Sequence, residues 1–177
     1  MAQPKKAKVT VELTKSSTAP FNWEIKSVLK KGKKLKFKNQ NHPGFDVHFD
    51  IDDKDKTGFL FPDDHTLAIA VQTYQGSAPP CPTQGQTWCE FCPVRVSENN
   101  TRLEVRNLNE NPAEFSYTLF LTKDPHGSNP KFEPIDPIGS NQNGPRFSSS
   151  TTIIAFAIGA AAVTLAIAYS FNLFERR

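Results

Sequence analysis

The sequence lacks the short motifs that usually mark an enzyme. It has no GxSxG nucleophile elbow, no P-loop, no GxGxxG dinucleotide fingerprint and no Ser, His and Asp spacing that suggests a catalytic triad. Methionine occurs once, as Met1, and the four histidines are scattered along the chain. We therefore expect a protein that is not an enzyme and that has no catalytic residues and no cofactor.

Helical periodicity is missing before residue 150, and apolar and polar residues alternate there instead. Alternation with a period of two is typical of half-buried β-strands. The segment NLNENP at 107–112 carries turn residues, and we expect it to form a hairpin-like connection. The pattern predicts an all-β fold, a Greek-key β-sandwich of about eight strands. The predicted strands cover residues 8–14, 21–28, 34–38, 47–52, 67–71, 93–97, 102–107 and 114–122.

Charged residues are absent from residues 153–171, which form an uncharged run at the end of the chain. A helix needs about 20 apolar residues to cross a bilayer. The sequence therefore predicts one C-terminal transmembrane helix and a short tail within 151–177. The segment 136–150 is rich in Ser, Asn, Gly and Pro, which predicts a linker. Residues 1–135 are then the sandwich domain.

Large aliphatic residues are few in the predicted span, and small ones recur at a spacing of four. Small residues at this spacing let helices approach closely in lipid, so the span is predicted to pack against other transmembrane subunits. The alternative is a generic alanine-rich anchor. The predicted helix-packing residues are Ala155, Gly159, Ala160, Ala162, Thr164, Ala166, Ala168 and Ser170.

An apolar run that would suggest a signal peptide is missing from the first residues. We therefore expect a single-pass protein of the bacterial inner or intracytoplasmic membrane, with its N-terminal domain in the cytoplasm. The many lysines of this domain agree with that orientation. Arg176 and Arg177 argue against it, because they would lie on the translocated side.

Acidic residues are scarce in residues 1–38, where eleven lysines face two glutamates. Such a segment can lie on anionic lipid or on an acidic partner, and the alternative is a set of solvated strand faces. Nucleic acid is not expected as a partner, because aromatic residues do not interleave with the exposed lysines. The predicted basic surface consists of Lys30, Lys31, Lys33, Lys34, Lys36 and Lys38.

The three cysteines all lie in one irregular, proline-rich stretch, residues 72–93. Cys89 and Cys92 form a CxxC pair, but the strand-like sequence that follows lacks the helix that lowers a catalytic thiol's pKa. With Cys81 and His65 the pair could supply four zinc ligands. The alternative interpretations are reduced structural thiols or a disulfide. Our main expectation is that the chain binds no metal.

The end of the domain carries an aspartate-proline-isoleucine motif within 132–138, followed by Asn143 and Gly144. This segment resembles the closing segment of small bacterial β-sandwich proteins, which have no known catalytic residues and are typically soluble. A cupredoxin-like sandwich with one added span is similar to the accessory subunits that bind reaction centres to antenna rings in some phototrophic bacteria. The span contains no histidine, the usual axial ligand of bacteriochlorophyll in antenna helices.

The resemblance to cupredoxins implies a cupredoxin-like fold, but we expect the copper site of that family to be absent. Blue copper sites use two His and one Cys, usually with an axial Met, and the family places Cys, His and Met close together just before the last strand. The last predicted strand begins at residue 114, and the segment that precedes it, 109–112, contains neither Cys nor His.

The sequence therefore predicts a non-catalytic, single-pass membrane subunit that scaffolds a larger membrane complex. The most specific form of this expectation is a photosynthetic reaction-centre or light-harvesting complex, with transmembrane subunits and the lipid bilayer as partners. The alternatives are a membrane-tethered metal or redox carrier that uses the cysteine stretch, and a tail-anchored ligand-binding module.

Overall fold

A computed structural model of the chain describes residues 3–31, 34–38, 44–76, 78–97 and 99–141. The chain divides into two units, Met1–Gly144 and Pro145–Arg177. The predicted transmembrane segment and all its predicted helix-packing residues lie outside the described residues. Within the described part of the chain, no helix is long and apolar enough to cross a membrane.

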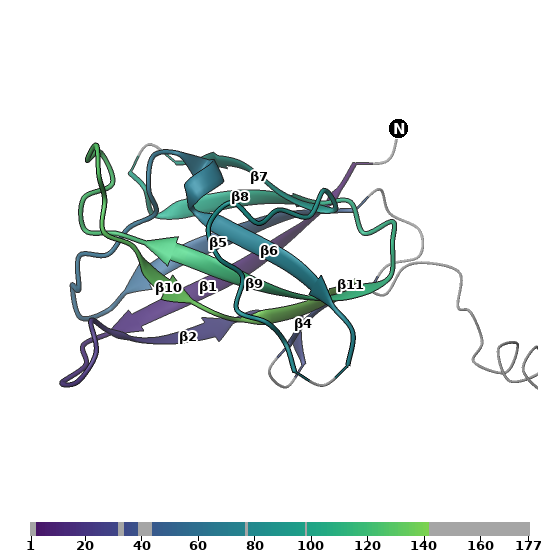
Figure 1. Cartoon of the computed structure of the whole chain (residues 1–177), viewed down its shortest axis with the longest axis horizontal. Coiled ribbons are helices and arrows are strands. Elements are labelled where there is room, and N and C mark those ends of the chain that lie inside the picture. Colours follow the sequence, from purple (N-terminus) through teal and green to yellow (C-terminus); the bar gives the residue numbers. More distant parts are fainter. Residues whose placement is uncertain (1–2, 32–33, 39–43, 77, 98, 142–177) are drawn as a thin grey trace, which may run out of the picture. The chain divides into compact units, whose positions relative to one another are not determined.

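The described residues form two mixed β-sheets, as expected for a β-sandwich (Figure 1). Sheet A has the order β2-β1-β5-β8-β7, and in sheet B strand β9 pairs with β6, β10 and β11, while β11 pairs with β4 and β4 with β3. Both sheets contain one parallel pair, β1 with β5 and β4 with β11. Sheet A contains β1 (Lys5–Thr14), β2 (Asn22–Lys26), β5 (Phe45–Asp53), β7 (Phe91–Val96) and β8 (Arg102–Asn107). Sheet B contains β3 (Lys30–Lys31), β4 (Lys34–Phe37), β6 (Ile69–Tyr74), β9 (Ala113–Leu121), β10 (Glu133–Ile135) and β11 (Ile138–Asn141).

All eight predicted strands are present, and burial follows the predicted alternation in β1, β4 and β8 and in the first half of β5. Strand β9 turns Phe115, Tyr117 and Leu119 into the space between the sheets, where none has exposed surface. In β1 the same alternation buries Val9 and Val11. Burying one such side chain contributes about 1.5–3 kcal/mol, so each strand is held in register by its apolar face.

The prediction of a linker from residue 136 onward is wrong for residues 136–141. Strand β11 lies between β9 and β4, where it is parallel to β4 and antiparallel to β9. Its Gly139 lies against the ring of Phe115, and a Cβ there would come within 2.5 Å of Phe115 Cζ. The glycine and serine that suggested a linker are therefore packing and pairing residues, and the sandwich extends beyond residue 135.

The connection at 107–112 is not a hairpin, because it joins strands of different sheets. Strand β8 belongs to sheet A and β9 to sheet B. The buried carboxylate of Glu90 holds this connection: its Oε2 accepts a hydrogen bond from the backbone N of Glu110 at 2.9 Å, and its Oε1 accepts one from Asn111 Nδ2. Alternation within a strand does not reveal which sheet the next strand joins.

The core between the sheets contains a cluster of phenylalanine rings. Phe37 of sheet B lies with its ring centroid 5.3 Å from that of Phe45 and 5.8 Å from that of Phe91, both in sheet A. Phe91 in turn lies 5.0 Å from Phe115. Tilted and edge-to-face contacts of this kind add to the stabilisation from burial. The two sheets are thus joined by one aromatic cluster near the end where β4 and β11 finish.

Candidate functional site

The described chain ends at one end of the sandwich, which we call the exit end. Asn141, the last residue of β11, pairs with Ala113 and lies beside Phe37. The connection 108–112 joins this point to Asn107, which is opposite Phe45, and Phe45 is opposite Lys5 at the start of β1. The start of β1 and the tip of β11 accordingly lie at the same end in Figure 1.

The exit end carries four lysines without a salt bridge among the described residues, together with the exposed Glu110 of the connection 108–112. Lys5, Lys6 and Lys38 are exposed and Lys36 is half-buried. No salt bridge joins any of these four to another described residue. They belong to β1 and to the end of β4, so segments far apart in the sequence contribute to one basic surface.

The opposite end of the sandwich, which we call the far end, mixes charges of both signs. The loops after β5 and β9 hold Asp63 and His126, and His126 Nδ1 lies 2.6 Å from Asp63 Oδ2. Asp63 Oδ1 also accepts a hydrogen bond from Asn100 Nδ2 at 2.7 Å. These contacts with His126 and Asn100 lower the pKa of Asp63. The far end also carries the exposed lysines Lys15, Lys56, Lys123 and Lys131, of which only Lys131 forms a salt bridge among the described residues.

The predicted basic surface is divided by the structure. Lys30 Nζ donates to the backbone oxygen of Ile25 at 2.7 Å and lies 3.8 Å from Glu24 Oε1. Lys34 Nζ is 2.6 Å from Glu114 Oε2. Its pKa is raised, chiefly by this hydrogen bond. Lys31 is exposed, and Lys36 and Lys38 belong to the exit end. Lys33 lies outside the described residues.

The cysteine stretch does not assemble a metal site in the described part of the chain. No three His, Cys, Asp or Glu residues among the described ones are grouped so that they could hold a metal ion. Cys81, Cys89 and Cys92 are all free thiols. Cys92 lies in β7 and donates to the backbone oxygen of Cys89 at 3.0 Å. Burial, with smaller contributions from Cys89 and Glu90, raises the pKa of the Cys92 thiol, which opposes formation of the nucleophilic thiolate.

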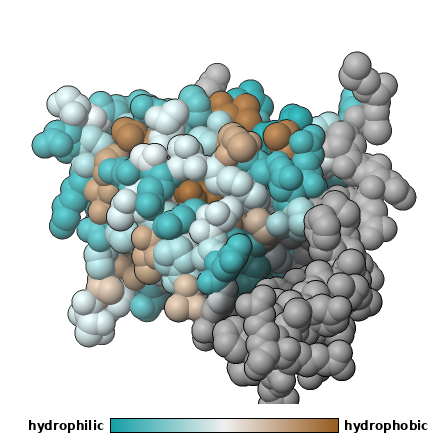
Figure 2. Space-filling model, turned by 45° about the vertical axis from the view of Figure 1, so that its right-hand side comes forward, coloured by the Kyte–Doolittle hydropathy of each residue, from teal (hydrophilic) through white to brown (hydrophobic). Residues whose placement is uncertain are grey.

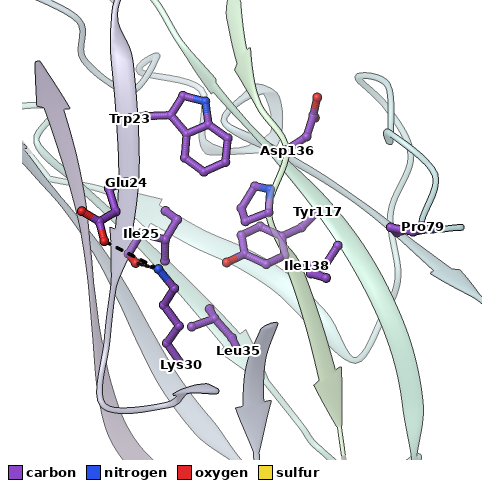
Figure 3. A pocket seen from close by; sticks show the side chains of 10 residues that line it. Trp23, Glu24, Ile25, Lys30, Leu35, Pro79, Tyr117, Asp136 and Ile138 are labelled. Carbon is purple, nitrogen blue, oxygen red and sulfur yellow. Dashed lines mark hydrogen bonds and ion pairs between the residues drawn. The ribbon is translucent and has the colours of Figure 1, made fainter. Parts of the chain in front are cut away.

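A pocket of about 400 Å³ lies between the edge strand β2 and residues 136–138. The sequence pattern did not predict it. Strand β4 begins at Lys34, opposite Ile138, so it does not extend beside residues 133–137. The edge strand β2 of sheet A faces this gap (Figure 3). The pocket is lined by Trp23, Glu24, Ile25, Lys30, Leu35, Pro79, Tyr117, Asp136, Pro137 and Ile138.

Tyr117 forms the inner wall of this pocket, and its hydroxyl has no hydrogen-bond partner among the described residues. The side chain is fully buried, and burial raises the pKa of the phenol well above its ordinary value. Figure 3 shows the hydroxyl oxygen directed toward the side of the pocket bordered by Ile25 and Lys30. A buried hydroxyl without a partner is uncommon in proteins.

Alternation in the predicted strand 21–28 places Trp23 on the same face as Phe21 and Ile25. Its pairing with the buried Leu13 agrees with this, but 42% of its surface is exposed. Trp23 lies at the rim of the pocket on β2, the edge strand of sheet A. Elsewhere the visible surface is mostly hydrophilic, with apolar residues in small separate spots (Figure 2).

The fold and its surfaces define an all-β sandwich with a basic exit end and an edge pocket. Comparison with protein-family models and with curated proteins found no match for this chain.

Proposed function

We propose that the chain is a non-catalytic, single-pass membrane subunit whose sandwich lies with its basic exit end against an anionic bilayer. The observation that carries the proposal is the position of Asn141. The chain leaves the sandwich at the end that carries Lys5, Lys6, Lys36 and Lys38, and the sequence continues to the uncharged run 153–171. At the far end, the exposed lysines are accompanied by several exposed carboxylates, those of Asp55, Asp63, Asp64 and Asp124.

The length of the intervening chain sets an upper limit on the distance between the sandwich and the bilayer. Eleven residues lie between Asn141 and Ile153, and the twelve Cα–Cα steps that join these two residues span roughly 40 Å when fully extended. Each lysine close to an anionic surface contributes about 1 kcal/mol, an attraction that fades within a Debye length of about 8 Å at physiological salt. Four unpaired lysines at the point of exit therefore favour one orientation of the sandwich.

The partners we propose are other transmembrane subunits, and the most specific proposal is a photosynthetic reaction-centre or light-harvesting complex of a bacterial inner or intracytoplasmic membrane. The small residues between Ala155 and Ser170 support helix packing. We also propose that the sandwich is cupredoxin-like without copper. Two strands, β10 and β11, follow β9, so the segment before the final strands is 122–132. It holds His126, paired with Asp63, but no Cys or Met.

Hydrogen exchange in nanodiscs tests the orientation. The full chain is reconstituted in nanodiscs, and the protection of exit-end backbone amides from hydrogen exchange is compared in phosphatidylglycerol and in phosphatidylcholine. We expect stronger protection of 5–8 and 34–38 in the anionic lipid, and loss of the difference at 0.5 M salt, roughly where the Debye length falls below 5 Å. Replacing Lys5, Lys6, Lys36 and Lys38 by Gln should abolish the difference.

The matched control replaces four exposed far-end lysines, Lys15, Lys56, Lys123 and Lys131, by Gln. This variant has the same net charge as the exit-end variant, so it distinguishes an effect of the exit-end surface from an effect of net charge alone. If the control variant loses the lipid difference as fully as the exit-end variant does, the proposed orientation is wrong.

Purification in mild detergent tests the scaffold proposal. The full chain should co-elute with other membrane subunits, and pigment absorbance should accompany them if the complex is photosynthetic. Gly159→Leu should release the chain from its partners, because it closes the small-residue row, whereas Ile167→Leu should not. Elution of the native chain as a lone monomer would contradict the proposal.

A further inference from the structure

The edge pocket has the size and chemistry of a small-molecule site. Its volume of about 400 Å³ falls within the usual 300–1,000 Å³ of ligand pockets, which are mostly apolar with a few polar groups that fix orientation. Here the walls are apolar side chains such as Ile25, Leu35 and Ile138, and Trp23 offers a ring at the rim. One polar group, the Tyr117 hydroxyl, is buried at the inner wall without a partner.

From this arrangement we propose that the pocket binds a neutral, largely apolar ring compound with one oxygen, a carbonyl or hydroxyl, that hydrogen-bonds to the Tyr117 hydroxyl. A phenol both donates and accepts a hydrogen bond, so either kind of oxygen can pair with it. The ring would lie between the apolar side chains of β2 and those of β4 and β11. The proposal is independent of the membrane orientation and of the partner subunits.

The charges around the pocket favour a neutral ligand over a carboxylate. Lys30 supplies the one cation in the lining, and its ammonium already donates to the backbone oxygen of Ile25 and lies near Glu24 (Figure 3). Asp136 adds a second carboxylate, and its Oδ1 accepts a hydrogen bond from Thr118 Oγ1 at 2.6 Å. An anion would therefore meet two carboxylates and a lysine that is already engaged.

Fluorine NMR on the full chain in nanodiscs tests the proposal with three matched probes. These are 4-fluoroacetophenone, a neutral ketone; 4-fluorobenzoate, its anionic counterpart; and 4-fluoroethylbenzene, which lacks the oxygen. Empty nanodiscs give the signal that arises from partition into lipid. We expect saturable binding of the ketone above this background, and weaker or no binding of the benzoate.

Tyr117→Phe should weaken ketone binding about five- to tenfold, as the loss of one hydrogen bond implies. The same variant should leave binding of 4-fluoroethylbenzene unchanged. Tyr74→Phe makes the same chemical change outside the pocket and should have no effect. Ile138→Trp should block all three probes by filling the space.

Three outcomes would overturn the proposal. The first is ketone binding no stronger than in empty nanodiscs, which would mean that the pocket holds water only. The second is equal affinity of the Tyr117→Phe variant and the native chain for the ketone. The third is preferential binding of 4-fluorobenzoate, which would make Lys30 rather than Tyr117 the recognising group. Thermal unfolding of each variant verifies that it is folded.

Discussion

At the residue scale, the molecule keeps one buried hydroxyl in an otherwise apolar position. Tyr117 alternates with Phe115 and Leu119 on the inner face of β9, and its ring centroid lies 5.6 Å from that of Phe49 and 5.9 Å from that of Phe91. A phenylalanine would make the same ring contacts. The hydroxyl therefore makes no contribution to these ring contacts.

Tyr117→Phe should leave the stability of the ligand-free domain unchanged or raise it by about 1 kcal/mol. The physical reason is that removing a buried, unpartnered hydroxyl also removes the cost of its desolvation. Thermal unfolding of the two proteins measures the difference. A clear loss of stability would show that the hydroxyl is satisfied in the folded protein, for example by an ordered water.

Gly44 occupies a position where no larger residue fits without strain. Its φ of +95° belongs to a region that favours glycine, and a Cβ there would lie 2.2 Å from the backbone oxygen of Asn107. Gly44→Ala should destabilise the domain by at least about 1–3 kcal/mol, because neither the backbone conformation nor the contact can relax cheaply. Chemical denaturation measures this loss. Gly85, which also has a positive φ but open space around it, supplies the control: Gly85→Ala should cost less.

At the element scale, β11 shows where local sequence patterns stop being informative. The sequence pattern predicted the eight main strands, because each contains enough apolar residues to indicate a buried face. The short β10 and β11 do not, and residues such as Gly139 and Ser140 are typical of loops. Their strand conformation comes from backbone pairing with β9 and, for β11, with β4. Such pairing partners are distant in the sequence.

A chain that ends at residue 135 should therefore fail to fold, whereas one that ends at residue 144 should fold. Without β11, strand β4 loses the neighbour that joins it to β9, and the backbone groups of both strands lose their partners. Circular dichroism and the cooperativity of thermal unfolding distinguish the two products. A cooperative transition in the shorter chain would show that β11 is dispensable.

At the scale of the whole molecule, carboxyl groups paired with cations or amides tie stability to pH. Asp50 is a clear example: burial raises its pKa, but hydrogen bonds from Arg102 and Lys8 outweigh burial and hold the pKa below its ordinary 3.8. Arg102 Nε lies 2.5 Å from Asp50 Oδ1. The pKa values of Glu12, Asp53, Asp63, Asp64 and Glu104 are lowered as well.

The free energy of unfolding should therefore fall in acid. A carboxyl group whose pKa is lower in the folded state stabilises the fold above its unfolded pKa, and this contribution is lost as the pH falls through about 4 and below. Denaturation curves between pH 6 and pH 2.5 measure the loss. Asp50→Asn should lower stability at pH 6 and reduce its acid dependence, while Asp52→Asn, an exposed position on the same strand, should change neither. An unchanged pH slope in Asp50→Asn would refute the assignment.

The sequence by itself determined the all-β class, the positions of the eight main strands and the uncharged run at the end of the chain, because alternation and apolar length are local properties. The tertiary structure decided which strands pair. It thereby decided the position of strand β11, the exit of the chain at the end that carries Lys5, Lys6 and Lys36, and the pocket at Tyr117. These depend on contacts between segments far apart in the chain. A β-sandwich hides such contacts from a sequence pattern, because its neighbouring strands are often distant in sequence.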